Sequence, residues 1–424
     1  MKVTVYPSKI SGKLKAIPSK SDVHRLLIAA AFSVNPTKIH CESISEDILS
    51  TADCLRSLGT DICYENGVFT VNPNKKATSG TLRCNESGTT LRLLLPIACA
   101  IGGEWVFDMR GRLPERPLSP LKEELISHGI SFERIDANKF KTCGKLKPGS
   151  YAISGNVSSQ FISGLLFALT LLGGTCTLEI KDKIESAPYV DMTIDVLNAF
   201  GANVIKNGSL FKVSTLDLTS KGEYHAQGDW SNSAFFLCAA AISKSSVTMT
   251  DLSIVSSQGD KEILSILESF GATVTKTENT VTVTGNELYG TEIDAKNIPD
   301  LVPVISVVAS VAKGITKIIG ASRLRIKESD RLQTTYEMLT NLGADIKILD
   351  DGFIINGKER LDGGSVLSYN DHRIAMSASI AALVCNEKVI INGAEAVKKS
   401  YPHFFEDIKK LGFNAEIISK GDEL

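Results

Sequence analysis

Leu55-Arg56-Ser57-Leu58-Gly59 is the first of six similar pentapeptides that recur along the chain and decide its fold class. Each one is typical of the end of a helix, because an apolar residue is followed by glycine, the residue that most readily adopts the left-handed conformation that stops a helix. The six glycines lie at intervals of 69 to 72 residues, which predicts six copies of one structural repeat. The other five pentapeptides are Leu125–Gly129, Leu197–Gly201, Leu267–Gly271, Leu339–Gly343 and Ile408–Gly412.

An alternating strand pattern follows each of the first five glycines. In residues 61–70 the pattern turns at Asn66-Gly67, and an Asn-Gly pair between two alternating strands is a strong hairpin signal. The sixth glycine is followed by one strand only, in FNAEIISKGDEL, whereas the N-terminal MKVTVYP is a strand without a hairpin partner. We therefore expect the N-terminal strand to complete the sixth repeat, so that both ends of the chain meet in one domain.

A second helix recurs in every repeat, rich in alanine, leucine and small residues. It lacks a wide polar face and should be buried. Each repeat then holds two helices and about four strands, and six repeats divide into three and three. We assign residues 15–226 to a first domain and residues 1–14 with 227–424 to a second, joined by a two-strand hinge. The six helices are expected to begin at Ser21, Ser87, Ser158, Ser231, Asp300 and Asp371.

Composition narrows the class of protein. With 424 residues, 43% hydrophobic and 22% charged, the chain has too much apolar material for a disordered protein. A net charge of −2 argues against general nucleic-acid or membrane-surface binding. Nine cysteines without a C-x-x-C pair, and no secretory signal at the start, favour a reducing cytoplasm. The apolar run 161–178 is interrupted by Gly173-Gly174 and is expected to be a buried helix end rather than a membrane span.

The polar helix starts have two readings. A serine or aspartate there can simply cap the free backbone amides. The same amides, with the helix dipole, also form an anion site when a cation stands beside them. Lys20 and Arg25 flank the first start, Arg92 follows the second and Arg373 lies in the sixth. If equivalent helices point the same way, their starts converge on a surface that binds more than one phosphate or carboxylate.

Three further segments carry cations. Arg116 lies in the proline-restricted loop LPERPLSP, and Lys399 lies in KKSYP. Lys327 and Arg331 are four residues apart, which predicts that they share one helical face; like charges at that spacing repel unless an anion lies between them. Taken singly, each segment could be an ordinary solvated surface.

As an ordered set, these segments resemble the enolpyruvyl transferases, most closely the members that act on shikimate 3-phosphate. The resemblance implies an α/β (α+β) fold of two similar domains, each made of three βαβαββ repeats in an inside-out α/β barrel, with a cleft between them. The matching stretches span nearly the whole chain in family order: PSKSDVHR (18–25), ESGTTLR (86–92), LPERP (113–117), SSQF (158–161), SAPY (186–189), SSQGD (256–260), IPD (298–300), RIKESDRL (325–332), NDHR (370–373) and KSYP (399–402).

The resemblance also implies the reaction. The enolpyruvyl group of phosphoenolpyruvate moves to the 5-hydroxyl of shikimate 3-phosphate by addition and elimination, with release of phosphate and without a metal or organic cofactor. Both substrates are polyanions, which suits the bidentate donor fork of arginine. We expect a monomer that binds neither nucleic acid nor membrane, and whose two domains close on the substrates.

Site residues carry over from the resemblance position by position. Asp300 is expected to be the base for the 5-hydroxyl, Glu328 to give and then remove a proton at the methylene carbon, and Lys20 to stabilise the charge of the departing phosphate. Phosphoenolpyruvate is expected to bind Lys20, Gly88, Arg116, Gln160, Arg331, Arg373 and Lys399. Shikimate 3-phosphate is expected to bind Ser21, Arg25, Ser158, Ser159, Gln160, Ser186, Tyr189, Asp300 and Lys327.

Two positions depart from the family pattern, and neither is assigned as a ligand. The family often has asparagine where this chain has Glu86, whose carboxylate must either pair with a cation such as Arg92 or turn away. Many members have asparagine where this chain has Arg323.

Two alternatives accompany this interpretation. UDP-N-acetylglucosamine enolpyruvyl transferases usually carry a cysteine in a mobile loop and a Lys-Asn pair near the start, whereas residues 108–120 here lack cysteine and Lys20 is followed by Ser21. A non-catalytic anion-binding relative would be expected to have lost Asp300 or Glu328, and both are present.

Overall fold

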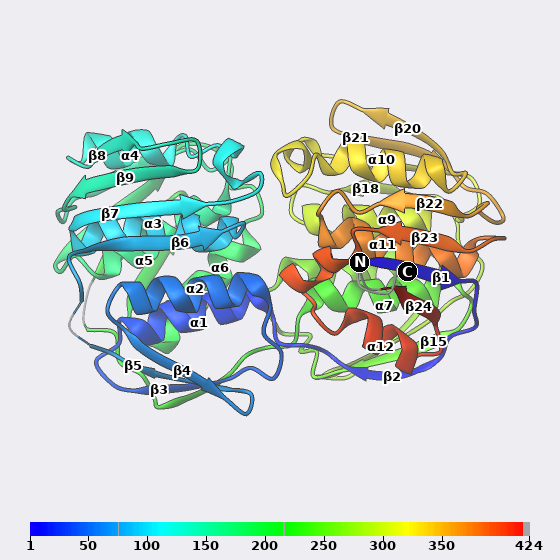
Figure 1. Cartoon of the computed structure of the whole chain (residues 1–424), viewed down its shortest axis with the longest axis horizontal. Coiled ribbons are helices and arrows are strands. Elements are labelled where there is room, and N and C mark those ends of the chain that lie inside the picture. The colour runs from blue at the N-terminus through cyan, green and yellow to red at the C-terminus, as the bar shows by residue number, and fades with distance from the viewer. Residues whose placement is uncertain (75, 215–216, 419–424) are drawn as a thin grey trace. The chain divides into compact units, whose positions relative to one another are not determined.

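The computed structural model describes residues 1–74, 76–214 and 217–418, which fold into two compact units (Figure 1). The central unit comprises Lys20–Ala226, and the terminal unit comprises Met1–Ser19 with Gln227–Leu424. Each unit has its own continuous apolar core. The first division falls five residues later than the predicted boundary at 14/15, because the backbone of 15–19 pairs within the terminal unit: Ala16 N donates to Thr250 O at 2.9 Å and Ser19 N to Gln227 O at 2.7 Å.

Six four-stranded sheets share one topology, which confirms the six predicted repeats. In each sheet the first two strands are parallel, and the third strand pairs antiparallel with both the second and the fourth. The central unit holds three sheets, in the orders β14-β3-β5-β4, β6-β7-β9-β8 and β10-β11-β13-β12. Their strands are β3 (Thr37–His40), β4 (Asp61–Glu65), β5 (Val68–Asn72), β6 (Ser79–Asn85), β7 (Gly103–Met109), β8 (Ser131–Arg134), β9 (Lys139–Gly144), β10 (Ser150–Ile153), β11 (Thr175–Ile180), β12 (Asn203–Asn207), β13 (Leu210–Ser214) and β14 (Glu223–His225).

The terminal unit repeats this arrangement three times, with sheets β2-β15-β17-β16, β18-β19-β21-β20 and β22-β23-β1-β24. The N-terminal strand lies between β23 and β24, antiparallel to both, and so completes the sixth repeat as predicted (Figure 1). The strands are β1 (Lys2–Tyr6), β2 (Gly12–Lys15), β15 (Ser246–Thr250), β16 (Thr273–Lys276), β17 (Thr280–Thr284), β18 (Glu292–Asp294), β19 (Ile315–Ile319), β20 (Asp345–Leu349), β21 (Gly352–Asn356), β22 (Gly364–Leu367), β23 (Val389–Asn392) and β24 (Asn414–Ile418).

Two strands join sheets that lie far from them in sequence. β2 precedes the first helix of the central unit but pairs with β15, and β14 precedes the first helix of the later half but pairs with β3. The repeats that contain β3 and β15 therefore obtain their first strand from a distant part of the chain, and with these strands all six repeats have the βαβαββ pattern.

Each repeat contributes one buried and one amphipathic helix. Most residues of the buried helices are buried, and in the central unit α3 and α5 pack directly on each other. They are α1 (Lys20–Ala31), α3 (Gly88–Ile101), α5 (Ser159–Thr170), α7 (Trp230–Ile242), α9 (Val302–Ala309) and α11 (His372–Ala381). The amphipathic helices are α2 (Glu46–Ser57), α4 (Leu121–Ser127), α6 (Pro188–Ala199), α8 (Ile263–Phe270), α10 (Arg331–Asn341) and α12 (Phe404–Lys410).

The six glycines that define the repeats all have positive φ angles, between 82° and 108°. Each follows an amphipathic helix, which confirms their predicted role as helix terminators. The predicted turn at Asn66-Gly67 is also present, with φ angles of 50° and 80°, and it joins β4 to β5.

Three predicted helix starts were wrong. Ser21 lies inside α1, which begins at Lys20. α7 is capped by Asp229, whose side chain accepts a hydrogen bond from Asn232 N at 2.7 Å, so Ser231 lies inside the helix. Asp300 lies in a separate 3-10 turn, η3 (Pro299–Leu301), and α9 begins only at Val302. Pro299 begins η3, and Pro303 is the second residue of α9. Proline suits these positions, since it lacks the amide hydrogen that the first turn of a helix leaves unpaired.

The predicted common helical face for Lys327 and Arg331 was also wrong. A 3-10 turn, η4 (Ser322–Ile326), ends before Lys327, and Asp330 caps a new helix that begins at Arg331. A capping aspartate stabilises the start of a helix by more free energy than a pair of charges four residues apart contributes. The helix therefore begins after Asp330.

The apolar run 161–178 divides into the C-terminal part of α5 and the start of β11, with Gly173 and Gly174 in the turn between them. Over the described ranges, no helix combines the length and the apolar content needed to cross a membrane.

Candidate active site

Three buried helices of the terminal unit begin around one carboxylate, that of Asp300. Arg373, in the first turn of α11, donates from Nη2 to Ser231 Oγ of α7 at 2.7 Å and to Asp300 Oδ2 at 3.3 Å. Asp300 itself stands just ahead of α9. The predicted convergence of helix starts is therefore present in this unit.

Arg331 is the buried centre of the cluster, with 1% of its side chain exposed. Its Nη1 donates to Asp300 Oδ1 at 2.7 Å, its Nε to Asp371 Oδ2 at 2.8 Å, and its Nη2 also contacts Glu328. Burial alone would lower the pKa of Arg331, but the carboxylates of Asp371, Glu328 and Asp300 outweigh it and raise that pKa. The guanidinium is thus permanently charged.

Lys327 approaches the same carboxylate, with Nζ 3.4 Å from Asp300 Oδ1. Burial lowers the pKa of Lys327 to about 8; Asp300 opposes the change, and the cations Arg323 and Arg331 reinforce it. The like charges of Lys327 and Arg331 are therefore bridged by an anion, which is the carboxylate of Asp300.

Asp300 is ionised in this setting. Burial favours the neutral acid, but Arg373, Lys327 and Arg331 together hold the pKa of Asp300 well below its usual range. An incoming anion that takes these cations would relieve this effect and make the carboxylate a better proton acceptor.

Asp260 was not predicted as a site residue, although it ends the quoted segment SSQGD. Its side chain is buried, and burial raises its pKa to about 6; Asp300 and Asp229 add to this, while Arg373 and Ser231 oppose it. No local sequence signal separates Asp260 from a simple helix-start residue, because Asp300 and Arg373 come from other repeats and Asp229 lies 31 positions earlier in the chain.

Two donors of Arg373 have no hydrogen-bond acceptor within the described part of the chain. Its Nε and Nη1 atoms are buried, and the residue is 4% exposed. Buried donors without acceptors cost free energy, which an anionic ligand would recover.

Lys399 reaches the segment that precedes α11. Its Nζ donates to Asn370 O at 2.7 Å. Tyr369 and Asn370 have φ angles of 53° and 56°, an unusual conformation for two consecutive non-glycine residues. The tertiary structure thus brings the segments KSYP and NDHR together.

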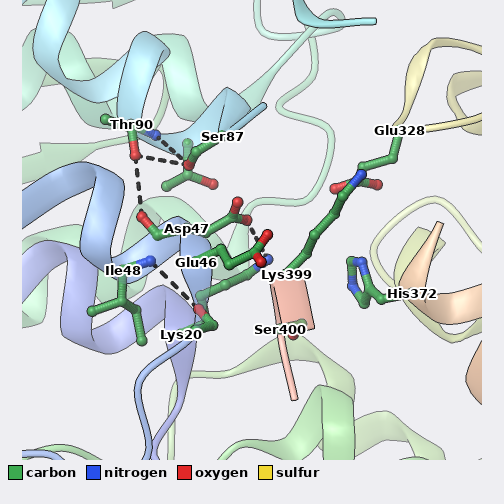
Figure 2. A network of polar contacts seen from close by, with 12 residues as sticks. Lys20, Glu46, Asp47, Ile48, Ser87, Thr90, Glu328, His372, Lys399 and Ser400 are labelled. Atoms are coloured by element: carbon green, nitrogen blue, oxygen red, sulfur yellow. Dashed lines mark hydrogen bonds and ion pairs between the residues drawn. The ribbon is translucent and has the colours of Figure 1, made fainter. Parts of the chain in front are cut away.

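In the central unit, Lys20 forms an ion pair with Asp47 of α2, with Nζ 2.8 Å from Oδ2 (Figure 2). The same network reaches the start of α3: Thr90 Oγ1 lies 2.7 Å from Ser87 Oγ and 3.5 Å from the backbone oxygen of Asp47. Asp47 was missed, since it is 27 residues from Lys20 and has the sequence appearance of an ordinary first-turn acid.

Arg25 is a residue of α1, and its buried side chain contacts α6. Its Nε, Nη1 and Nη2 donate to Thr193 Oγ1 at 2.8 Å, Ser21 O at 2.6 Å and Tyr189 O at 2.8 Å. Burial lowers the pKa of Arg25 to about 10. In this structure Arg25 joins two helices that carry predicted ligands of shikimate 3-phosphate.

The starts of α3 and α5 are joined through Gln160. Its amide nitrogen donates to Thr89 Oγ1 at 2.8 Å, and its oxygen accepts from Arg92 Nη1 at 2.9 Å. Ser158 caps α5 and accepts from Gln160 N at 3.3 Å.

Arg116 lies against Gly88 at the first residue of α3. A Cβ atom on Gly88 would stand 2.6 Å from Arg116 Nη1, so only glycine leaves this approach open. The carboxyl group of Glu86 lies beside Gly111, where an added Cβ atom would meet Glu86 Cδ at 2.6 Å.

The remaining predicted ligands are also placed near helix starts. Ser159 is buried in the first turn of α5, and Ser186 is buried just before α6 with a φ angle of 55°. Each unit thus gathers cations and hydroxyl groups at the starts of its three buried helices, an arrangement that can bind several phosphate or carboxylate groups.

Comparison with known proteins places this arrangement in a family. A family profile described as "EPSP synthase (3-phosphoshikimate 1-carboxyvinyltransferase)" matches residues 5–408. The 3-phosphoshikimate 1-carboxyvinyltransferase of Clostridium perfringens (strain SM101) is 42% identical over 419 residues, covering 97% of this chain and 98% of that protein. The protein of the same name from Clostridium kluyveri is 41% identical over 425 residues, covering 99% of each.

Solved structures agree with the sequence relatives. An EPSP synthase from Acinetobacter baumannii has a TM-score of 0.83 and 26% identity, over 99% of this chain and 100% of that one. The enolpyruvyl transferase NikO from Streptomyces tendae shares the fold, with a TM-score of 0.75 and 17% identity over 98% of each chain. The repeats, the ordered motifs and these matches together show that the chain belongs to the EPSP synthase (3-phosphoshikimate 1-carboxyvinyltransferase) family.

Proposed function

We propose that this chain is a transferase that moves the enolpyruvyl group of phosphoenolpyruvate to the 5-hydroxyl of shikimate 3-phosphate, giving 5-enolpyruvylshikimate 3-phosphate and phosphate. The observation that carries the proposal is the Asp300 carboxylate, held by Arg331, Lys327 and Arg373 beside Glu328. A protein that only bound anions would gain nothing from two carboxylates among the cations that must attract its ligand.

The proposed chemistry uses these two carboxylates in turn. Asp300 accepts the proton of the 5-hydroxyl while the oxygen of that hydroxyl bonds to C2 of phosphoenolpyruvate. At the same time Glu328 donates a proton to C3. In the second step the Glu328 carboxylate removes a C3 proton while the C2–O bond to phosphate breaks, and the proton held by Asp300 passes to the departing phosphate, so that both side chains return to their starting forms. Lys20 stabilises the departing phosphate. The step needs no group that the chain itself lacks.

We assign the ligands of phosphoenolpyruvate from both units. Support comes from the close approach of Arg116 to Gly88 and from the donors of Arg373 that are left without acceptors. The proposed set is Lys20, Gly88, Arg116, Gln160, Arg331, Arg373 and Lys399.

The proposed ligands of shikimate 3-phosphate are gathered in the same way. Support comes from the bond network that joins Arg25 to Ser21 and Tyr189 and from the caps at the start of α5. The set is Ser21, Arg25, Ser158, Ser159, Gln160, Ser186, Tyr189, Asp300 and Lys327. Because it also draws on both units, we propose that the units close on the substrates as a cytoplasmic monomer, hinged where the chain passes between them after Ser19 and after Ala226.

An assay of phosphate release tests the function directly. Phosphoenolpyruvate with shikimate 3-phosphate should release phosphate at an enzymatic rate, and neither substrate alone should do so. Turnover with UDP-N-acetylglucosamine in place of shikimate 3-phosphate would move the chain to the alternative activity. Binding of both substrates without turnover would support a non-catalytic protein.

The pH dependence of kcat/KM should show the pH at which Lys327 loses its charge. Its pKa of about 8 means that it is charged below pH 8 and loses the charge as pH rises, and with it the attraction for the anionic substrate. We expect kcat/KM for shikimate 3-phosphate to fall above pH 8, by up to about tenfold per pH unit. Lys327→Arg is the matched control, since arginine stays charged; this variant should lose that alkaline limb. An identical alkaline limb in both proteins would exclude Lys327 as its source.

A further inference from the structure

Two histidines and a glutamate lie together on one face of the sheet β14-β3-β5-β4, in the central unit. His225 ends β14 and stands directly opposite His40, which ends the parallel strand β3. Glu223 lies two residues before His225 and therefore on the same face. None of the three belongs to the proposed active site.

Their ligand atoms are close to one another. One nitrogen or oxygen from each of the three residues lies within 4.8 Å of the other two. The His40 and His225 rings are stacked, with centroids 4.1 Å apart and an interplanar angle of 12°. His40 Nε2 is 2.5 Å from Glu223 Oε1, and this hydrogen bond lowers the pKa of Glu223.

We propose that His40, Glu223 and His225 bind a divalent zinc ion at the surface of the central unit. Two imidazoles and one carboxylate form a ligand set that zinc commonly takes, with a fourth position left for water. The parallel pairing of β3 and β14 fixes the spacing, because directly opposed residues on neighbouring strands hold their side chains about 5 Å apart.

Only side-chain rotation is needed to form the site. Zinc at ~2.1 Å from each ligand atom in tetrahedral geometry requires those atoms to be about 3.4 Å apart. The side chains of His40 and Glu223 are 34% and 58% exposed, so they are free to turn about their χ angles. In the bound state, zinc replaces the hydrogen bond between His40 and Glu223.

One cation opposes the metal. Lys38 is the register partner of Glu223 on β3 and shares the face of the cluster. It contributes to the lowered pKa of Glu223. We therefore expect Lys38→Ala to tighten zinc binding by about threefold.

Zinc bound at this site would stabilise the pairing of β14, the last strand of the central unit. Among the described residues β14 is an edge strand whose one partner is β3, and it ends one residue before the chain leaves the unit at Ala226. A metal bridge from β14 to β3 would oppose local opening of this edge.

Zinc titration by calorimetry tests the site, in a protein with Cys63→Ser and Cys143→Ser because these two cysteines are exposed and could bind zinc themselves. One zinc should bind per chain. His40→Ala and His225→Ala should each weaken binding at least tenfold, and Glu223→Gln should weaken it by less. Zinc should also slow hydrogen exchange of the amides in residues 223–226.

His403→Ala is the matched control. His403 and Glu406 form an exposed pair with Nδ1 3.2 Å from Oε2 but without a second imidazole, so this variant should bind zinc as the parent does. Zinc affinity that is unchanged in both His40→Ala and His225→Ala, or binding weaker than millimolar in the parent, would overturn the proposal. Because no step of the proposed reaction uses these residues, failure here would leave the phosphate-release assay unaffected.

Discussion

Replacing Asp300 with asparagine is expected to lower kcat by about 10²–10⁴, the range typical of a lost general base. The amide cannot accept the 5-hydroxyl proton. It also removes the negative charge that Arg331, Lys327 and Arg373 share, so these cations become more available to anions. The dissociation constant of phosphoenolpyruvate should therefore stay the same or decrease while turnover is lost. Phosphate release gives kcat, and calorimetry gives the affinity.

A second signature distinguishes Asp300 from other acids in the site. The carboxylate raises the pKa of Lys327, so the asparagine variant should lose the charge of Lys327 at a lower pH than the wild type does. Glu328→Gln is the comparison: it should also lose most turnover, but the alkaline limb should move less, because Glu328 is the weakest of the named influences on Lys327. A kcat within tenfold of wild type for Asp300→Asn would remove Asp300 from the role of base.

Asp371→Ala is expected to destabilise the terminal unit by about 3–5 kcal/mol, the usual cost of removing one partner of a buried ion pair. Asp371 is fully buried and accepts from Arg331 Nε at 2.8 Å and Nη2 at 3.1 Å, and from Ser329 Oγ at 2.9 Å. It also caps α11 by accepting from Arg373 N at 3.0 Å. The alanine variant leaves the Arg331 guanidinium buried without one of its counter-charges. Asp371→Asn keeps a capping side chain and should lose less.

The chain offers a way to measure this loss in one unit at a time. Its two tryptophans are Trp105 in the central unit and Trp230 in the terminal unit, and both are buried. Urea unfolding of a Trp105→Phe protein reports the terminal unit, and unfolding of a Trp230→Phe protein reports the central unit. Asp371→Ala should lower the midpoint reported by Trp230 and leave the Trp105 signal nearly unchanged. A Trp230 transition shifted by less than 1 kcal/mol would contradict the role of Asp371 in holding Arg331.

Local signals in the sequence predicted the repeats well, because each repeat depends on short-range chemistry. The six helix-ending glycines and the turn at Asn66-Gly67 adopt the positive φ angles that their positions predicted. The lone strand MKVTVYP was assigned to the sixth repeat, and β1 lies there. Periodic patterns of this kind need no knowledge of distant contacts.

Predictions about charge at helix starts were less reliable. Lys327 and Arg331 were expected on one helical face, but Asp330 caps a new helix that begins at Arg331. Ser231 and Asp300 were expected to begin helices, yet Asp229 and the prolines of the η3–α9 segment set the actual starts. Several capping residues stood close together in each case, and which of them caps a helix depends on packing that the local sequence does not specify.

The sequence by itself determined the α/β repeat, its sixfold recurrence, the family resemblance and most of the cations expected at the site. The tertiary structure decided which carboxylates accompany those cations. Asp47 forms an ion pair with Lys20, and Asp371 forms one with Arg331. Asp260 is buried, and its pKa is influenced by Arg373. The physical reason is that ion pairs and pKa values depend on distances of a few ångströms between residues that lie tens to more than a hundred positions apart in the chain.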